Sequence, residues 1–218
     1  MDRQPEPELM EDPEQVRAYA EADFAVPHQQ FVDRLRAFVG DPEFSGIALD
    51  LGCGPCDIGL CFAKAFPRCR IDAVDGSRAM LDYAAIRTPS IGNRIRLIHE
   101  RLPFVIFPEQ FYAIIFSNSL LHHLPDPQAL WQTIKKAARP GTRIAVMDLL
   151  RPASLEAAMA LVEAHAAGEP EILRRDFYRS LLAAFTLEEI RDQLKKAELP
   201  LNIEPISDRH VFIEGVMP

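Results

Sequence analysis

The sequence predicts an α/β fold, with a mostly parallel sheet that carries helices on both faces. Between residues 46 and 150, short apolar runs of strand length alternate with amphipathic stretches of helix length. This alternation is the pattern of parallel strands joined by crossover helices. The first run, residues 47–51, leads directly into a glycine-rich turn, as expected of a buried parallel strand.

The first segment, residues 1–45, is predicted to form a helical cap. Asp12-Pro13 marks the start of a helix that reaches about residue 22, with Gln15 placed to close a capping box. A second helix follows Pro27, because apolar residues recur there every three or four positions. It ends at the glycine and proline of residues 40–42.

Residues 46–150 are predicted to form the core. Its strands are connected by a helix over 58–66, a helix that begins after Ser77 and a helix capped by Asp126. The predicted core strands are residues 47–51, 70–74, 95–98, 112–116 and 142–147.

Beyond residue 150 the alternation stops. Two Ala-rich helical stretches, 154–167 and 170–184, follow each other without a strand between them. An amphipathic pair of this kind, placed after the fifth strand, predicts a helical lid over residues 151–185.

The last segment, residues 186–218, is predicted to complete the sheet. Thr186 and Glu189 have the spacing of a capping box for a final helix. Residues 201–206 and 210–216 then form an antiparallel pair around a short polar turn, which brings the number of strands to seven.

Length and charge narrow the function. About half of the 218 residues are apolar, enough to bury one sheet, so a single domain over residues 1–218 is expected. The net charge of −8 argues against a surface that neutralises phosphates, so no nucleic-acid partner is expected. The polar, acidic start has no secretory signal, and no apolar run approaches membrane-spanning length. A cytoplasmic protein without a membrane partner is therefore predicted.

The four cysteines lie within residues 53–69 and are expected to be reduced, because disulfides there would close only short loops. Cys53 and Cys56 have the spacing of a zinc or redox pair, but the other cysteines do not supply the second pair that a zinc site needs. No metal is expected from this pattern.

The turn after the first strand is the predicted ligand site, since ligands of open parallel sheets bind beyond the carboxyl ends of the strands. Gly52 and Gly54 allow close backbone approach, but Asp57 stands where a dinucleotide motif has its third glycine. Asp50 and Asp57 also flank the turn with negative charge, which disfavours a pyrophosphate. S-adenosylmethionine has an ammonium and a sulfonium and no phosphate, so it suits this turn.

Asp75 ends the second strand, 21 residues after Gly54. A carboxylate there can accept hydrogen bonds from both ribose hydroxyls of the cofactor. The alternative is a helix-capping role, because Gly76 and Ser77 follow and Ser77 is itself a good N-cap. The two roles are compatible.

On these motifs the chain resembles the class I S-adenosylmethionine-dependent methyltransferases. The matching stretches are residues 49–55, residues 74–77 with Met80, and residues 116–124. The resemblance implies a Rossmann-like, doubly wound sheet of seven strands that binds S-adenosylmethionine.

The resemblance also implies where individual residues lie along the cofactor. It places Asp50, Gly52, Cys53 and Gly54 at the methionine end, Asp75 at the ribose, Met80, Arg101 and Leu102 at the adenine, and Asn118 beside the sulfonium. Gly76 and Ser77 are also expected to bind the cofactor.

Outside the core, the resemblance narrows to a group of small, poorly characterised methyltransferase-like proteins of bacteria. Its features here are residues 19–24, 147–152 and 176–185. The group implies a lid over the active site and identifies no acceptor.

Two candidate catalytic residues follow the fourth strand. Asn118 contacts the cofactor or the acceptor, or else it holds the backbone at the strand end. His122 can deprotonate an acceptor at neutral pH, or else it and His123 orient the loop that follows. Asp148, at the end of the fifth strand, faces the same cleft by topology.

Two further candidates are tyrosines outside the core. Tyr178 in the lid can cover the sulfonium by a cation–π contact or bond the amino-acid end, whereas helix packing is the alternative and is favoured for Phe177. Tyr19, with Phe24, lies in the helix that caps the cofactor in related proteins, with amphipathic packing as the alternative.

The expected function is methyl transfer to a small molecule, with S-adenosylhomocysteine as the product. Alignment and exclusion of water supply much of the acceleration, so a base is needed only for a protonated acceptor. The fourth strand ends in Ser117-Asn118-Ser119-Leu120, which lacks the Pro-Pro-aromatic signature of base and glutamine methylation.

Two alternatives stay open at this point. One is attack on the γ-carbon beside the sulfonium, by ring closure or aminocarboxypropyl transfer, which releases methylthioadenosine. The other is a non-catalytic cofactor-binding protein. The sequence makes no prediction of the oligomeric state.

Overall fold

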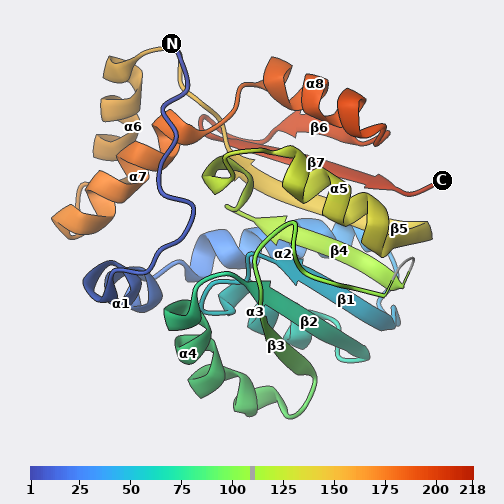
Figure 1. The fold of residues 1–218 in the computed structure, drawn as a ribbon. Helices are drawn as coiled ribbons and strands as arrows, with labels where there is room; N and C mark the ends of the chain where they lie inside the picture. Colours follow the sequence, from blue (N-terminus) through green and yellow to red (C-terminus); the bar gives the residue numbers. More distant parts are fainter. Residues whose placement is uncertain (109–110) are drawn as a thin grey trace.

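The centre of the molecule is a sheet of seven strands, and the computed structural model describes residues 1–108 and 111–218. The strands follow the order β3-β2-β1-β4-β5-β7-β6 across the sheet (Figure 1). Neighbours among the first five are parallel, whereas β7 is antiparallel to both β5 and β6. The strands are β1 (Gly46–Leu51), β2 (Cys69–Asp75), β3 (Ile95–His99), β4 (Tyr112–Asn118), β5 (Ala138–Leu149), β6 (Asn202–Pro205) and β7 (His210–Val216).

Helices cover both faces of this sheet, and the predicted doubly wound α/β architecture is confirmed. In the described residues, none of the helices is both long and apolar enough to cross a membrane. The helices are α1 (Pro13–Glu21), α2 (Ala25–Val39), α3 (Asp57–Ala65), α4 (Arg78–Arg87), α5 (Gln128–Ala137), α6 (Leu155–Ala166), α7 (Glu171–Ala183) and α8 (Leu187–Ala197), with short 3-10 helices η1 (Thr88–Ile91) and η2 (Leu121–His123).

Alternate residues along each strand face opposite helix layers, because side chains of a strand point to the two faces in turn. In β1, Ala48 joins the apolar cluster completed by α2 and α3, whereas Leu49 joins the cluster completed by α5 and α8. On the first face, Phe62 stacks on Phe116 with the ring centroids 4.8 Å apart. On the other face, Trp131 is fully buried. The core therefore consists of two apolar layers with the sheet between them.

The direction of winding reverses at β1, whose two neighbours are β2 and β4. Backbone segments beyond the carboxyl ends of β1 and β4 diverge at such a point and leave a crevice, which is where ligands of this architecture bind. The register pairs Leu51 with Ser117, so the glycine turn after β1 and the polar end of β4 lie side by side.

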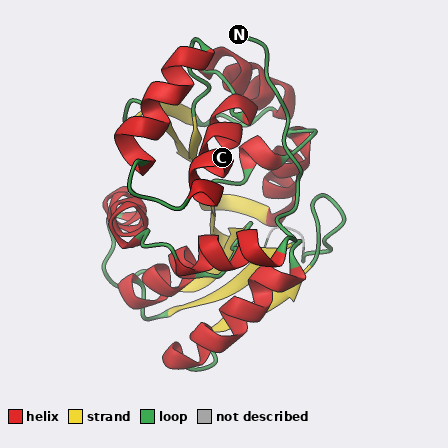
Figure 2. Cartoon of the chain, turned by 90° about the vertical axis from the view of Figure 1, so that its left-hand side faces the viewer, coloured by secondary structure: helices red, strands yellow, loops and turns green. Residues whose placement is uncertain are grey.

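Two segments from distant parts of the sequence cover this end of the sheet. The helices α6 and α7 pack together through an apolar cluster that includes Val162 and Leu181. Residues 3–10, which we call the N-terminal strap, cross the same region in an extended path (Figure 1). In Figure 2 this part of the chain descends as a loop from the N-terminus.

Hydrogen bonds fix the strap at both ends. The Arg3 guanidinium donates to the carbonyls of Ala183 at 2.5 Å and His122 at 2.7 Å, which ties the start of the strap to α7 and to the loop after β4. At the other end, Ser77 Oγ donates to the Met10 carbonyl at 2.7 Å. The strap is therefore held in a defined position by tertiary hydrogen bonds.

Several predicted helix ends are confirmed. Asp12 caps α1 by accepting hydrogen bonds from two backbone amides of its first turn. Gly40 ends α2 in the left-handed conformation. The capping box of Thr186 and Glu189 forms at the start of α8, with both of its hydrogen bonds present. These features are local, which is why the residue pattern predicts them.

Two boundaries differ from the prediction, whereas the first helix begins at Pro13 as expected, and α1 and α2 supply the helical part of the N-terminal cap. Pro27 lies inside the first turn of α2 and does not precede it, because the amides of a first turn have no partner within the helix. The strand β5 begins at Ala138, four residues before the predicted start at Thr142.

Candidate active site

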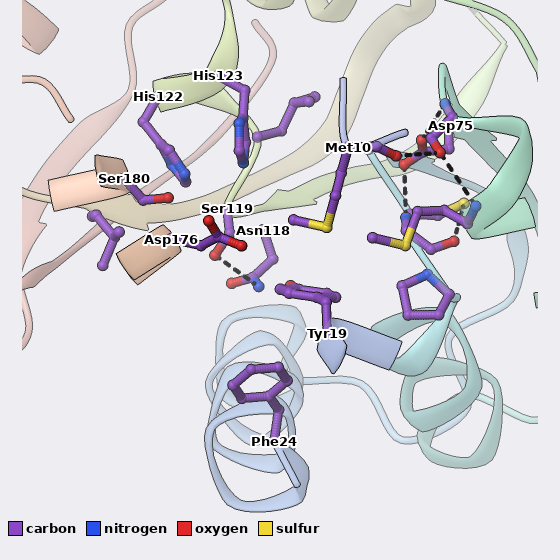
Figure 3. A pocket seen from close by; sticks show the side chains of 18 of the residues that line it. Met10, Tyr19, Phe24, Asp75, Asn118, Ser119, His122, His123, Asp176 and Ser180 are labelled. Atoms are coloured by element: carbon purple, nitrogen blue, oxygen red, sulfur yellow. Dashed lines mark hydrogen bonds between the residues drawn. The ribbon is translucent and has the colours of Figure 1, made fainter. Parts of the chain in front are cut away.

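A cavity of about 540 Å³ lies at the carboxyl ends of β1, β2 and β4, under the strap, α1, α2 and α7. Figure 3 shows lining side chains from the strap, α1, β2, β4, the loop after β4 and α7. Every residue predicted to bind the cofactor lines this one cavity. They are Asp50, Gly52, Cys53, Gly54, Asp75, Gly76, Ser77, Met80, Arg101, Leu102 and Asn118.

The glycine turn after β1 is held against β2. The backbone amides of Gly52 and Cys53 both donate to the Val74 carbonyl, at 2.9 and 3.0 Å. Gly52 has φ of +74°, and a Cβ there would lie 2.9 Å from the side chain of Leu120. A larger residue would therefore strain the backbone and displace the loop after β4, so glycine is required at this position.

Asp75 joins this turn to the start of α4. Its carboxylate accepts hydrogen bonds from the Gly54 amide at 2.8 Å and from the Ser77 amide at 2.7 Å. Burial raises the pKa of Asp75, although these two amide hydrogen bonds oppose the shift. Ser77 is the N-cap of α4, as predicted, because its hydroxyl accepts from the Met80 amide at 3.2 Å. Asp75 thus holds two loops together and still lines the cavity.

Asp50 is a buried carboxylate without a partner. Its side chain lines the cavity, the residue is 2% exposed, and Oδ2 has no hydrogen-bond partner among the described residues. Burial, together with the nearby charge of Asp75, raises the pKa of Asp50 well above its usual value. A buried carboxylate in this state is stabilised by a cation. The ammonium of S-adenosylmethionine therefore fits this end of the cavity.

The strap borders the side of the cavity where the resemblance implies the adenine. Arg101 donates to the carboxylate of Glu8 in the strap at 2.7 Å. A Cβ on Gly76 would lie 2.7 Å from Leu9 of the strap and 2.9 Å from Arg101. With Met80 buried beside them, these contacts make a wall that depends on the strap lying in place.

The opposite side of the cavity, which we call the acceptor side, is built around Asn118 and Asp176 (Figure 3). Asn118 donates to Ser119 Oγ at 3.2 Å, but its Oδ1 has no partner among the described residues, and neither has Asp176 Oδ2. Tyr19 packs on Phe24 with the ring centroids 5.2 Å apart. Burial raises the pKa of Tyr19 to about 12, with the charges of nearby aspartates adding to the shift. Its hydroxyl therefore remains protonated.

His122 is tied to the end of β5. Its Nδ1 lies 2.5 Å from Asp148 Oδ1, and the Leu121 amide donates to Asp148 Oδ2 at 2.7 Å. Burial would lower the pKa of His122, but Asp148 and Glu6 outweigh it and the pKa is raised. Burial lowers the pKa of His123 to about 3, so that ring is neutral. The bonds of Asp148 hold the loop after β4 in place.

Tyr178 lies outside the cavity, in contrast to its predicted place beside the cofactor. It packs, with Phe177, against the apolar cluster of α6 and α7. Asp176 and Ser180 are four residues apart and face the cavity from the same side of α7. Tyr178 stands two positions from each, and a helix turns it away from that face.

Glu6 and Asp176 are among the carboxylates of the cavity that residue patterns did not predict. Glu6 belongs to the strap, which has no periodic pattern, and its Oε1 accepts from Ser180 Oγ at 2.9 Å. Asp176 belongs to an expected helix whose orientation was not assigned. The signal that could have found it is the spacing of Asp176 and Ser180, two polar residues on one face of a lid helix.

The comparison with known families decides the classification. Residues 48–141 match a family model described as a methyltransferase domain. Over these residues the chain carries a methyltransferase domain, as the resemblance to the class I S-adenosylmethionine-dependent methyltransferases implies. S-adenosylmethionine is the cofactor of that family, and the eleven residues that the family resemblance implies for its binding all line the cavity.

Among curated relatives, a trans-aconitate 2-methyltransferase of Methylobacterium radiotolerans is 32% identical over 110 residues, 48% of this chain and 38% of that protein. A 27-O-demethylrifamycin SV methyltransferase of Amycolatopsis mediterranei is 27% identical over 168 residues, 73% of this chain and 56% of that protein. The chain thus spans about half or less of the length of these relatives.

Solved structures share the fold. A crystal structure of an S-adenosylmethionine-dependent methyltransferase from Aquifex aeolicus superposes with a TM-score of 0.67 at 15% identity, over 94% of this chain and 98% of that one. The comparisons lend no support to the two alternatives, γ-carbon attack and non-catalytic binding.

Proposed function

We propose that this protein transfers the methyl group of S-adenosylmethionine to a small molecule. The observation that carries the proposal is one cavity with unpaired buried acceptor atoms at both ends among the described residues, Asp50 at one end and Asn118 with Asp176 at the other. A volume of about 540 Å³ lies within the range of about 300–1,000 Å³ that is usual for small-molecule sites. The strap and α7 cover it, which favours a small acceptor over a macromolecule.

The cofactor end fits S-adenosylmethionine group by group. Asp50 would pair with the ammonium, which removes the cost of its burial. Asp75 already accepts two backbone hydrogen bonds, but a carboxylate has about four acceptor sites, so two remain for the ribose hydroxyls. Met80 and Leu102 would contact the adenine. When bound, S-adenosylmethionine supplies a methyl group on a positive sulfur, which is already activated for displacement.

The acceptor side would align the nucleophile. Asn118 Oδ1 and Asp176 Oδ2 can each accept a hydrogen bond from an N–H or O–H group of the acceptor. The Tyr19 hydroxyl, whose pKa is raised to about 12, acts there as a hydrogen-bond donor and not as a base. These groups orient the acceptor, and the strap keeps water out. Orientation and water exclusion supply much of the acceleration of such displacements.

The test is to identify the nucleoside product by mass spectrometry. Purified protein is incubated with S-adenosylmethionine alone and then with a panel of small acceptors that carry amine, hydroxyl, thiol or carboxylate groups. We expect S-adenosylhomocysteine, and only when an acceptor is present. Methylthioadenosine without an acceptor would overturn the proposal. Tight cofactor binding without turnover on any acceptor class would also count against it.

Asp176→Asn separates the two ends of the cavity. We expect this variant to keep its affinity for S-adenosylmethionine, because Asp176 lies on the acceptor side, and to lose turnover or raise the KM for the acceptor. If Asp176→Asn weakened S-adenosylmethionine binding as much as it impaired the use of the acceptor, the two sides of the cavity would not be distinct.

A further inference from the structure

We propose that Glu6 of the strap, with His122 and His123, forms a binding site for a divalent transition-metal ion such as Zn²⁺ or Fe²⁺. The cysteine pattern predicts no metal, but these three residues come together only in the folded chain. One ligand atom from each lies within 4.8 Å of the other two. Two imidazoles and a carboxylate are a donor set that such ions bind.

The distances between the donor atoms suit a shared ion. Glu6 Oε1 lies 3.5 Å from His122 Nε2 and 3.3 Å from His123 Nδ1. Metal–ligand bonds of about 2.0–2.2 Å place neighbouring ligands of one ion about 3.0–3.6 Å apart. His123 Nδ1 is buried and has no hydrogen-bond partner among the described residues. The two distances from Glu6 Oε1 to the histidine nitrogens are thus longer than those of good hydrogen bonds, and they match the spacing between two ligands of one metal ion.

The second nitrogen of His122 is already bonded, which orients the free one. His122 Nδ1 lies 2.5 Å from Asp148 Oδ1, so a proton on Nδ1 directs the lone pair of Nε2 toward Glu6. Histidines that bind metals use carboxylates in this way to fix the ring and its tautomer.

The local charge also favours a dication. Glu6, Asp148 and Asp176 face this region from the strap, β5 and α7. The cations near them are Arg3 of the strap and the half-exposed Arg175, whose Nε lies 3.4 Å from Asp176 Oδ1. The side chains of Glu6 and His122 are only 10% and 3% exposed. Buried anions in excess of their cations are costly, and a bound divalent ion would neutralise them.

Such an ion would join the strap to the loop after β4, because Glu6 comes from one and the histidines from the other. Three protein ligands leave at least one coordination position for water or an oxygen of the acceptor. This last role rests on the proposed function, since the three residues line the same cavity as Asn118 and Asp176.

The experiment uses the full chain, freed of metal with a chelator, and no S-adenosylmethionine. Co²⁺ and Zn²⁺ are titrated separately, with visible absorption of Co²⁺ and calorimetry as readouts. We expect one equivalent to bind, and Co²⁺ to show the intense bands of a site with fewer than six ligands. Glu6→Gln and His123→Ala should each weaken binding by more than 10-fold, and Asp148→Asn by about 10- to 100-fold through the orientation of His122.

His165→Ala is the matched control, because His165 also lines the cavity but pairs with Asp208 at 2.7 Å, away from Glu6. It should leave Co²⁺ binding unchanged. Circular dichroism and cofactor binding show whether Glu6→Gln and His123→Ala are folded. The proposal is overturned if the wild type gives only the weak spectrum of the hydrated ion, or if folded Glu6→Gln and His123→Ala bind like the wild type. The product assay above is separate, so failure of either idea can be told from failure of the other.

Discussion

Replacing Asp50 by asparagine should raise stability and lower cofactor affinity in the same molecule. The carboxylate is 2% exposed, and its Oδ2 has no partner among the described residues. Leaving a buried polar group unpaired costs about 1–3 kcal/mol, and more when the group is charged. The amide has a similar shape and no charge, so the ligand-free variant should be more stable by about 1–2 kcal/mol at pH 7.5.

That gain corresponds to an increase in Tm of about 2–8 °C for a chain of this size. The stability difference between Asp50→Asn and the wild type should depend on pH. Burial raises the pKa of Asp50 in the folded state, so the folded chain holds this proton more tightly than the unfolded chain. The wild type therefore recovers stability as the pH falls from the raised pKa toward the ordinary carboxyl value of about 4. The advantage of the variant should be largest above the raised pKa and should shrink below it.

The effect on the cofactor has the opposite sign. If Asp50 pairs with the ammonium, Asp50→Asn should lose about 1–3 kcal/mol of binding free energy, roughly a 5- to 150-fold rise in Kd. Calorimetry measures the Kd, and thermal unfolding with and without S-adenosylmethionine measures both effects. Asp82→Asn is a suitable control, because that exposed carboxylate lies on α4 and pairs with the exposed Arg78. A less stable ligand-free variant with unchanged affinity would refute the argument, because it would mean that Asp50 already has a partner.

Three further substitutions test separate parts of the structure. Asp75→Ala should weaken S-adenosylmethionine binding by about 1–3 kcal/mol in calorimetry, and unchanged affinity would contradict the ribose assignment. Tyr178→Phe should leave kcat and KM unchanged in the product assay, because the side chain lies outside the cavity; a large drop in kcat would place it back in the site. Thr186→Ala removes the N-cap of α8 and should lower the free energy of unfolding by about 0.5–2 kcal/mol, measured by denaturant unfolding, without changing cofactor affinity. An unchanged free energy of unfolding would show that this cap contributes nothing to stability.

The core could be predicted because its signals are local. A buried strand such as 47–51 is a short apolar run that ends in glycine, and the start of α8 is marked by two residues three positions apart. The start of β5 was missed because it depends on pairing with another strand. Ala138 pairs with Tyr112 across an irregularity in the register, which no property of residues 138–141 indicates.

The cofactor side could also be predicted, since its residues follow the ends of adjacent strands and topology brings them together. The acceptor side could not. Glu6 meets His122 across 116 positions of sequence, and the strap that carries it is ordered by tertiary hydrogen bonds and not by its own periodicity. Tyr178 was misplaced for a related reason: its helix was predicted, but the face that this helix turns to the cavity is set by packing against α6.

The bonds that anchor the strap also set an order of events during synthesis. Arg3 is made 180 residues before Ala183, the carbonyl to which it donates. The strands β1 to β5 and the glycine turn are complete by residue 149, so the cofactor groups can assemble on the ribosome while the cavity is still open. The wall formed by Glu6, Glu8 and Leu9 closes only after α7 has emerged. A site that is walled in this way is a late product of folding, although the strap precedes the other walls in the sequence.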